Sequence, residues 1–323
     1  MSPSIAILGP GGVGGLLAAA LVRSGVDVTV VARESTAETI ARDGIVVQST
    51  RLGDFTAQPQ AVARLSEPVD VLLVATKAAA LEEALARVDI FPPAQPALVV
   101  PLLNGFDHMA LLRARFGARV AAGTIRVQAD RPETNPPTPP ARVVQRGNFL
   151  FVELASDDAA LRPRLDELGA ALEAAGIDTR VSHDKSEARI LWGKLVRLNT
   201  LACMTTAYDA TFGAIRADPA RWAELEACVR EGAAVARAEG AEIDPAVVLG
   251  EFEVIHDGFG TSMQRDVAAG REPELDAIAG AVLRAGARHG LACPTIAALA
   301  ARIAGRTTYV SSGALYSVQK FRP

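Results

Sequence analysis

The chain has 323 residues, of which 50% are hydrophobic and 22% are charged, and its formal net charge is −4 with a sequence pI of about 5.7. This composition predicts a folded globular protein of two domains and excludes a disordered chain. The sequence has no basic stripe and no interleaving of basic and aromatic residues, which argues against nucleic acid as a partner. No apolar run approaches the roughly 18 residues of a membrane-spanning helix.

The first predicted strand, 5–8, runs directly into a glycine-rich turn, Gly9-Pro10-Gly11-Gly12-Val13-Gly14, which opens a helix. Gly9 would allow a tight turn, Gly11 the close approach of a pyrophosphate, and Gly14 close packing of the helix on the strand. The N–H groups and the dipole at the start of a helix also favour an anion. The turn therefore predicts a dinucleotide site.

The residue after the second predicted strand, 28–31, bears on the choice of cofactor. NAD-binding folds place an acidic residue near this point to bind the ribose 2′-hydroxyl. Here the strand is followed by Ala32-Arg33, and an arginine can pair with a 2′-phosphate instead. The sequence thus favours NADPH, although Glu34 keeps NAD open and Arg33 could be an ordinary solvated side chain.

Further apolar runs alternate with helical periods up to about residue 182, which is typical of an α/β domain with a doubly wound parallel sheet. The stretch after residue 31 is predicted to be irregular apart from a short strand. The expected strands are 45–47, 69–75, 97–103, 119–127 and 178–181, and the expected helices are 79–88 and 161–175. Five prolines within 132–140 predict an extended loop. Residues 142–145 and 149–153 are predicted to form a hairpin around Arg146-Gly147-Asn148.

From about residue 185 the strand-like alternation stops and long alanine- and leucine-rich helical periods follow. The expected helices are 186–207, 219–239, 245–256, 274–289 and 293–303. We therefore predict an NADP-binding Rossmann domain over 1–184 and an all-α domain over 185–323. The helical domain could serve packing or dimerisation, or it could supply a lid and catalytic groups to a cleft.

The cysteines and histidines show no motif of their own. The three cysteines and four histidines are widely spaced, so we expect neither a disulfide framework nor a metal site. The chain enters its first strand at once, which leaves no room for a signal peptide and predicts a cytoplasmic protein.

Lys194 lies within the apolar arc of the first long helix, together with Leu191, Leu195 and Leu198. Desolvation lowers the pKa of a lysine and makes it a usable proton donor near neutral pH. A lysine whose head group reaches solvent past the leucines is the alternative.

Five motifs in order make the chain similar to the ketopantoate reductase (2-dehydropantoate 2-reductase) family. They are Gly9–Gly14, Ala75-Thr76-Lys77-Ala78, Leu103-Asn104-Gly105, Trp192-Gly193-Lys194-Leu195, and Thr261-Ser262-Met263 followed by Asp266 and Glu274-Leu275-Asp276. The resemblance covers essentially the whole chain. It implies an NADPH-dependent oxidoreductase of pantothenate biosynthesis that reduces a 2-keto acid to a 2-hydroxy acid. The expected partner is a small-molecule keto acid, and the oligomeric state, including a homodimer, stays open.

Position by position, the resemblance makes Lys194 the catalytic proton donor and Glu274 the carboxylate that orients it. Ser262 and Asn104 are implied to bind substrate, and Asp266 to support the same helical turn. The implied cofactor-binding residues are Gly9, Gly11, Gly12, Val13, Gly14, Arg33, Lys77 and Asn104. Glu274 could instead be a favourable acid at a helix start, and Ser262 a helix cap.

The chain departs from the family at two positions. The family carries asparagines four and eight residues after the lysine, where this chain has Leu198 and Ala202. Asn199 is one position late and rotated by about 100° around the helix, and it is retained as a substrate-binding candidate. We therefore expect a less hydroxylated or more apolar keto acid than ketopantoate, with Thr205 or Thr206 as further polar contacts.

Two other functions stay open. One is an opine- or imine-type dehydrogenase that acts on a C=N bond. The other is a non-catalytic NADPH-sensing protein, which the presence of Lys194 and Glu274 argues against and the absence of the two asparagines favours.

Overall fold

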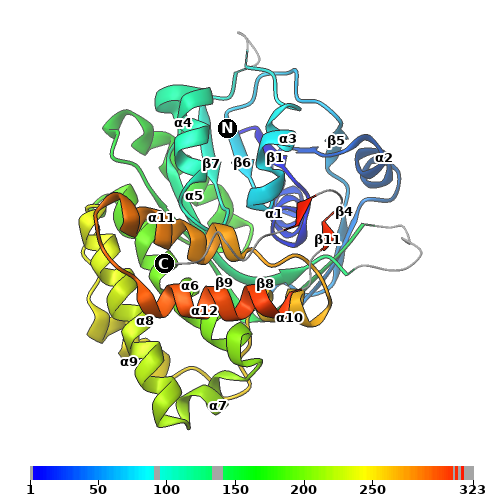
Figure 1. Cartoon of the computed structure of the whole chain (residues 1–323). Helices are drawn as coiled ribbons and strands as arrows, with labels where there is room; N and C mark the ends of the chain where they lie inside the picture. Colours follow the sequence, from blue (N-terminus) through cyan, green and yellow to red (C-terminus); the bar gives the residue numbers. More distant parts are fainter. Residues whose placement is uncertain (1–2, 91–94, 133–140, 308–309, 312–313, 316–323) are drawn as a thin grey trace. The chain divides into compact units, whose positions relative to one another are not determined.

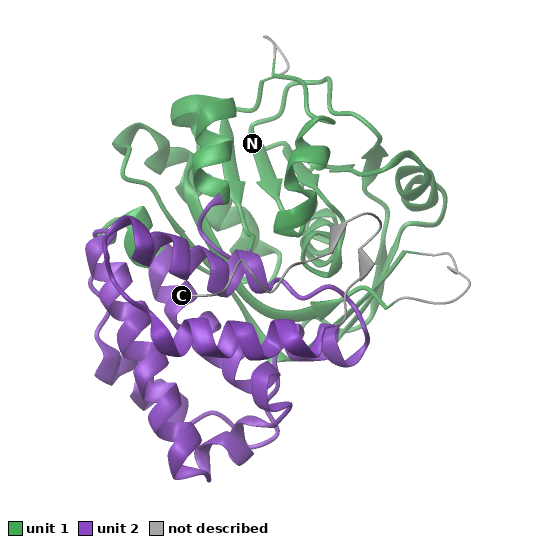
Figure 2. Cartoon of the chain, in the orientation of Figure 1, with its two compact units in different colours: residues 1–103, 108–190 green, residues 104–107, 191–323 purple. Residues whose placement is uncertain are grey.

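The computed structural model describes residues 3–90, 95–132, 141–307, 310–311 and 314–315. The chain forms two compact units (Figure 2). Unit 1 contains Met1–Leu103 and His108–Ile190, and unit 2 contains Asn104–Asp107 and Leu191–Pro323. The division into domains 1–184 and 185–323 stays a prediction. The boundary between the two units falls between Ile190 and Leu191, inside a helix. The segment Asn104–Asp107, which follows Leu103 of unit 1, belongs to unit 2.

Unit 1 contains a five-stranded parallel sheet (Figure 1). Its strands are β1 (Ile5–Leu8), β2 (Val28–Val31), β5 (Gln60–Val62), β6 (Val71–Val74) and β7 (Leu98–Pro101), in the order β5-β2-β1-β6-β7. Every neighbouring pair is parallel. β1, β6 and β7 are buried along their whole length, which is why they are continuous apolar runs in the sequence. The Rossmann-like α/β prediction is confirmed.

A second sheet in unit 1 departs from the prediction of a single parallel sheet. It has the order β10 (Asp178–Val181), β9 (Ala141–Ala155), β3 (Ile45–Ser49) and β4 (Phe55–Ala57), and β8 (Ala122–Asp130) also pairs with β9. β9 is parallel to β3 and β10 but antiparallel to β8, so this sheet is mixed.

The predicted hairpin around Arg146-Gly147-Asn148 is wrong. These residues lie inside the single strand β9, both halves of which pair with β8. The register moves from Arg146 opposite Gln128 to Leu150 opposite Val127, so residues 147–149 bulge out, with Gly147 at φ +72°. The turn-forming residues therefore bend the strand without reversing it. The predicted proline loop connects β8 to β9, and its residues 133–140 lie outside the described part of the chain.

Helix α1 (Gly12–Arg23) contacts both sheets of unit 1. It contacts β1 and β2 of the parallel sheet and β3, β4, β8 and β9 of the mixed sheet. Its residues from Gly14 to Leu21 are buried, as a helix between two sheets requires. The remaining helices of unit 1 are α2 (Glu34–Asp43), α3 (Leu81–Leu85) after a 3₁₀ turn at Ala78–Ala80, α4 (His108–Phe116) followed by a 3₁₀ turn at Gly117–Arg119, and α5 (Arg162–Ala174) after a 3₁₀ turn at Ala159–Leu161.

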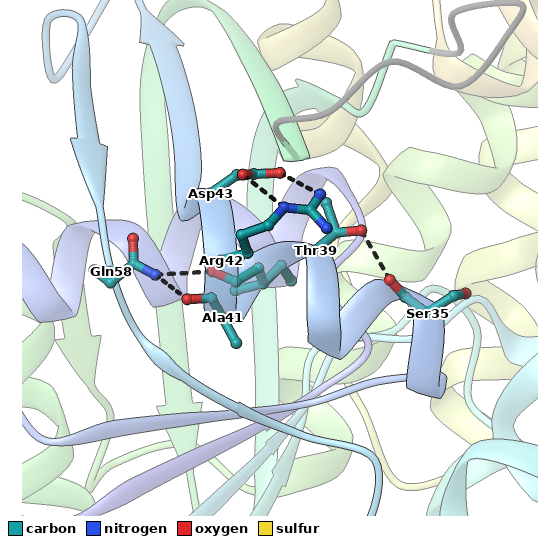
Figure 3. A network of polar contacts seen from close by, with 7 residues as sticks. Ser35, Thr39, Ala41, Arg42, Asp43 and Gln58 are labelled. Carbon is teal, nitrogen blue, oxygen red and sulfur yellow. Dashed lines mark hydrogen bonds and ion pairs between the residues drawn. The ribbon is translucent and has the colours of Figure 1, made fainter.

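Helix α2 replaces the irregular stretch that was predicted after residue 31. It buries only Ala37 and Ile40, so it has too few apolar residues to stand out as a helix in the sequence. Side-chain contacts secure its end: the Gln58 Nε2 group donates a hydrogen bond of 2.6 Å to the Ala41 carbonyl oxygen (Figure 3). Gly44, at φ +73°, then ends the helix.

Unit 2 is helical, as predicted. Its elements are α6 (Glu187–Tyr208), whose first residues belong to unit 1, α7 (Phe212–Arg216), α8 (Pro219–Ala238), α9 (Pro245–Glu253), α10 (Ser262–Ala268), a π-helical turn (Asp276–Gly280) continuing into α11 (Ala281–Arg288), and α12 (Pro294–Arg306). Proline begins α8, α9 and α12, where its missing N–H is not needed. The short helices α7 and α10 and the two-residue strands β11 (Val310–Ser311) and β12 (Ala314–Leu315) were not predicted. No helix in the described ranges is long and apolar enough to cross a membrane.

Candidate functional site

The glycine-rich turn of unit 1 follows β1 and forms the start of α1. Gly9 has φ +92°, and a Cβ atom there would lie 2.6 Å from the Thr76 Cγ2 atom. A Cβ at Gly14 would lie 2.2 Å from the Gly9 carbonyl oxygen. In contrast, no described atom lies within 4 Å of the corresponding position at Gly11. Gly9 and Gly14 are therefore required by the turn itself, whereas Gly11 leaves a space that a Cβ would fill.

Two neighbouring residues of the turn have packing roles. A Cβ at Gly12 would lie 2.2 Å from the Ala129 carbonyl oxygen in β8, so this glycine lets α1 approach the mixed sheet. Val13 is partly buried against the core of unit 1. Helix geometry leaves the first N–H groups of α1 without intrahelical acceptors, and its N-cap is Gly11, which has no side chain to accept from them. The turn thus combines open space with backbone donors, the arrangement that binds an anion.

Arg33 is the N-cap residue of α2 and forms an ion pair with Glu83 of α3. Its Nη2 atom lies 3.2 Å from Glu83 Oε2, and its Nε atom donates to Glu83 Oε1 at 3.3 Å. Both side chains are largely exposed, at 69% and 57%. The hydrogen bond from Arg33 holds the pKa of the Glu83 carboxyl below its usual range. Arg33, which is predicted to bind the 2′-phosphate of the cofactor, therefore already contacts the Glu83 carboxylate.

Lys77 lies close to the glycine turn in the fold of unit 1. β6 is the neighbour of β1, with Val74 opposite Leu8, and the chain continues through Thr76 to Lys77. The Lys77 side chain is exposed, and the residue is the N-cap of the 3₁₀ turn Ala78–Ala80. The Thr76 Oγ1 atom, beside Gly9, is buried without a hydrogen-bond partner among the described residues. Unit 1 thus places Lys77 and the unsatisfied Thr76 hydroxyl group near the glycine-rich turn.

In unit 2, three of the predicted site residues form a continuous polar chain. The Lys194 Nζ atom of α6 donates to Asn104 Oδ1 at 2.9 Å, and Asn104 Nδ2 donates to Glu274 Oε2 at 2.9 Å. Lys194 and Glu274 are half-buried. The Lys194 ammonium group is therefore held by the Asn104 amide within unit 2. This differs from the alternative in which the lysine extends past the leucines into solvent. The structure brings together residues that are 170 positions apart in the sequence.

Asn104 is fixed by the residues that follow it. Gly105 has φ +89°, and a Cβ there would lie 2.3 Å from the Ala277 carbonyl oxygen in the π-helical turn. The ring of Phe106 contacts the buried Trp192 of α6, with 5.6 Å between their centroids. The segment Asn104–Asp107 is thus packed on α6 and on the π-helical turn at once, which explains why it clusters with unit 2.

The remaining predicted residues of unit 2 have contacts of their own. Asn199 is fully buried, and its Nδ2 atom donates to Cys228 Sγ at 3.4 Å while its Oδ1 atom accepts from Cys203 Sγ at 3.5 Å. Its amide makes these contacts inside the helical core, and a substrate contact by Asn199 stays a prediction. Asp266 pairs with Arg271 at 2.8 Å.

Ser262 is the exposed first residue of α10. The residue before it, Thr261, is the cap: its side chain accepts a hydrogen bond from the Gln264 N–H group and lies 2.9 Å from the Thr205 hydroxyl. Thr205 therefore supports the start of α10. Thr206 is buried as well, at 1% exposure.

The cysteines are buried and are free thiols. Burial raises the pKa of Cys228 to about 12 and that of Cys293 to about 11, and it also raises the pKa of Cys203. Protonated, inaccessible thiols are unsuited to nucleophilic catalysis. Within the described ranges, no group of three or more histidine, cysteine, aspartate or glutamate side chains is arranged to hold a metal ion.

Sequence reasoning missed Glu83 and Phe106. Glu83 meets Arg33 from 50 residues away, and nothing in the local sequence marks it. Phe106 directly follows the motif Leu103-Asn104-Gly105, and an aromatic residue so close to a polar site residue is a signal that could have been used.

Comparison with known proteins places this chain. Residues 5–152 match the family model of the ketopantoate reductase PanE/ApbA, and residues 188–307 match the model of its C-terminal part. The 2-dehydropantoate 2-reductase of Caulobacter vibrioides is 30% identical over 306 residues, which are 92% of this chain and 97% of that protein.

Two solved structures have similar folds. The 2-dehydropantoate 2-reductase from Geobacter metallireducens has a TM-score of 0.80 at 28% identity, over 94% of this chain and 100% of that one. A ternary complex of D-mandelate dehydrogenase with NADH and anilino(oxo)acetate has a TM-score of 0.82 at 22% identity, over 94% of this chain and 98% of that one. With both family models matched in order over most of its length, this chain belongs to the ketopantoate reductase family of oxidoreductases.

Proposed function

We propose that this chain is an NADPH-dependent reductase that converts a 2-keto acid to the 2-hydroxy acid, with Lys194 as the proton donor. The observation that carries this proposal is the polar chain Lys194–Asn104–Glu274, which holds a cationic donor in a fixed place. Membership of the ketopantoate reductase family supports a 2-keto acid as the substrate class.

The residues of unit 1 fit a nicotinamide dinucleotide that carries a 2′-phosphate. The open space at Gly11 and the N–H groups at the start of α1 suit the pyrophosphate. Arg33 could exchange the Glu83 carboxylate for the 2′-phosphate, since the pair is exposed, and Lys77 offers a second cation nearby. When bound, NADPH supplies the hydride for the keto carbon.

The residues of unit 2 supply the proton. Asn104 is an amide and cannot remove a proton from Lys194, so its oxygen orients the ammonium group without neutralising it. An ionised carboxylate can accept hydrogen bonds but cannot donate them, so Glu274 pairs with the amide nitrogen of Asn104 and fixes which way that amide faces. An ammonium group held in this way can stabilise the charge that develops on the substrate oxygen and then donate a proton to it.

The substrate is proposed to be less hydroxylated than ketopantoate. Leu198 lies one helical turn after Lys194 and is half-buried, and Ala202, one turn further, is buried. Neither side chain can hydrogen-bond a substrate hydroxyl group. Burying a substrate hydroxyl group without a hydrogen-bond partner costs the free energy of its desolvation. The site should therefore prefer a keto acid with an apolar side chain.

The experiment follows NADPH oxidation with ketopantoate, with 2-keto acids bearing plain alkyl or aromatic side chains, and with each keto acid plus an amine. We expect turnover without the amine and a higher kcat/KM for the apolar keto acids. A dependence on the amine would indicate an imine-type dehydrogenase, and NADPH binding without any turnover would indicate a sensor. A strong preference for ketopantoate over every non-hydroxylated analogue would contradict the substrate proposal.

A matched pair of variants tests the cause of this preference. Leu198→Asn should raise kcat/KM for ketopantoate relative to the apolar keto acids, because it restores a hydrogen-bonding group one turn after the lysine. Leu198→Ala removes the leucine without adding that group and should not. Equal behaviour of the two variants would show that side-chain volume sets the preference.

A further inference from the structure

Arg284 of α11 joins the two segments that carry Asn104 and Glu274. Its Nε and Nη2 atoms donate to Asp107 Oδ2 at 3.1 and 2.6 Å. Its Nη1 atom donates to Asp276 Oδ1 at 2.8 Å, and its Nη2 atom also donates to the Asp276 carbonyl oxygen at 3.0 Å. One guanidinium group thus holds two carboxylates and a backbone carbonyl.

Both partners of Arg284 stand next to residues of the polar chain. Asp107 ends the segment Asn104–Asp107, and Asp276 lies two residues after Glu274 and begins the π-helical turn. The same two segments are therefore connected twice, once by the Asn104–Glu274 hydrogen bond and once through Arg284. The second connection lies outside the groups that are proposed to act on the substrate.

The backbone is shaped around this connection. A Cβ atom at Gly280 would lie 2.9 Å from Arg284 Nη1 and 2.9 Å from Asp276 Oδ1, so a glycine leaves room for the ion pair. Gly105 likewise allows the segment to approach the carbonyl oxygen of Ala277 in the π-helical turn. π-helical turns are rare and occur frequently at functional sites. Here the turn presents Asp276 to Arg284 two residues after Glu274.

We propose that Arg284 is a positioning residue that sets the spacing between Asn104 and Glu274 and thereby the direction of the Lys194 ammonium group. The inference rests on the proposed function, since it assigns Lys194 as the proton donor. Arg284 contacts Asp107 and Asp276 with a planar fork, and a lysine offers a single point charge in its place. The Arg284 side chain is 44% exposed, and exposed ion pairs contribute little to stability. Loss of Arg284 should therefore affect catalysis far more than folding.

The test compares Arg284→Gln with Arg284→Lys and with a matched control, Arg288→Gln. Arg288 lies one turn further along α11, is 50% exposed and pairs with Glu239 at 3.1 Å, so its loss removes an ion pair on the same helix that involves neither Asp107 nor Asp276. We expect Arg284→Gln to lower kcat by about tenfold or more, because small displacements of a reacting group are costly. The KM for NADPH and the melting temperature should stay near the wild-type values. Arg284→Lys should restore only part of kcat, and Arg288→Gln should behave as wild type.

A second readout does not require turnover. The chain has four asparagines, so ¹⁵N-asparagine labelling gives four side-chain amide signals, and the Asn104→Ser variant identifies that of Asn104. Arg284→Gln should shift the Asn104 signal, and Arg288→Gln should leave it in place. An unmoved Asn104 signal together with an unchanged kcat would overturn the proposal. If no keto acid is reduced by the wild-type protein, the proposed function fails, while the Asn104 signal still tests the positioning role.

Discussion

Replacing Asn104 by alanine removes the link between Lys194 and Glu274. The variant loses two hydrogen bonds of 2.9 Å, one from an ammonium group and one to a carboxylate. Hydrogen bonds to charged groups contribute about 1.5–3 kcal/mol each. If only the bond that orients Lys194 counts in the transition state, this range corresponds to a loss of about tenfold to somewhat over a hundredfold in kcat.

The assay measures kcat at saturating NADPH for Asn104→Ala, Lys194→Ala and the double variant. Lys194→Ala should lower kcat by about 10²–10⁴-fold, the usual contribution of a general acid. If Asn104 acts through Lys194, the double variant should be no slower than Lys194→Ala alone. Asn148→Ala provides the matched control, because Asn148 is exposed on the bulge of β9. Additive losses in the double variant, or an unchanged kcat for Asn104→Ala, would refute the reasoning.

Three further predictions concern unit 1 and the thiols. Glu83→Gln should tighten NADPH binding at low salt by up to about fivefold without changing NADH binding, because Arg33 loses its competing carboxylate. Fluorescence titration with both cofactors measures the two affinities. An equal change for both cofactors would contradict the prediction. Gly11→Ala should melt as wild type but weaken NADPH binding by about tenfold, whereas Gly9→Ala should destabilise the fold itself, because its φ is +92°; calorimetry and titration separate the two. At pH 9 the folded protein should resist alkylation at Cys228, whose pKa is raised to about 12, while the unfolded chain reacts; rapid labelling of the folded protein would show that the thiol is accessible.

Much of unit 1 could be predicted because its signals are local. The strands β1, β6 and β7 are continuous apolar runs, and the glycine turn follows directly from the first of them. The bulge in β9 could not be predicted in this way. Arg146-Gly147-Asn148 has the composition of a turn, and only the pairing of both flanking halves with β8 decides that the chain continues in the same direction.

The candidate site shows the same division between local and distant information. The helical period placed Lys194 on a defined face of α6 and placed Asn199 about 100° around the helix from Leu198, but it did not report that the Asn199 side chain is buried in the helical core. The contacts of Asn104 with Lys194 and Glu274 span 90 and 170 positions, and the Arg33–Glu83 pair spans 50. Such contacts depend on how the elements pack, and no pattern within one element reports them.

The proton-donor role of Lys194 is tested most directly by one comparison, in which NADPH oxidation and NADPH binding are both measured for the wild-type protein and for Lys194→Ala. We expect the wild-type protein to reduce a 2-keto acid with one NADPH consumed per hydroxy acid formed. Lys194→Ala should bind NADPH with nearly unchanged affinity and lose turnover. A variant that reduces the keto acid at the wild-type rate would contradict the account.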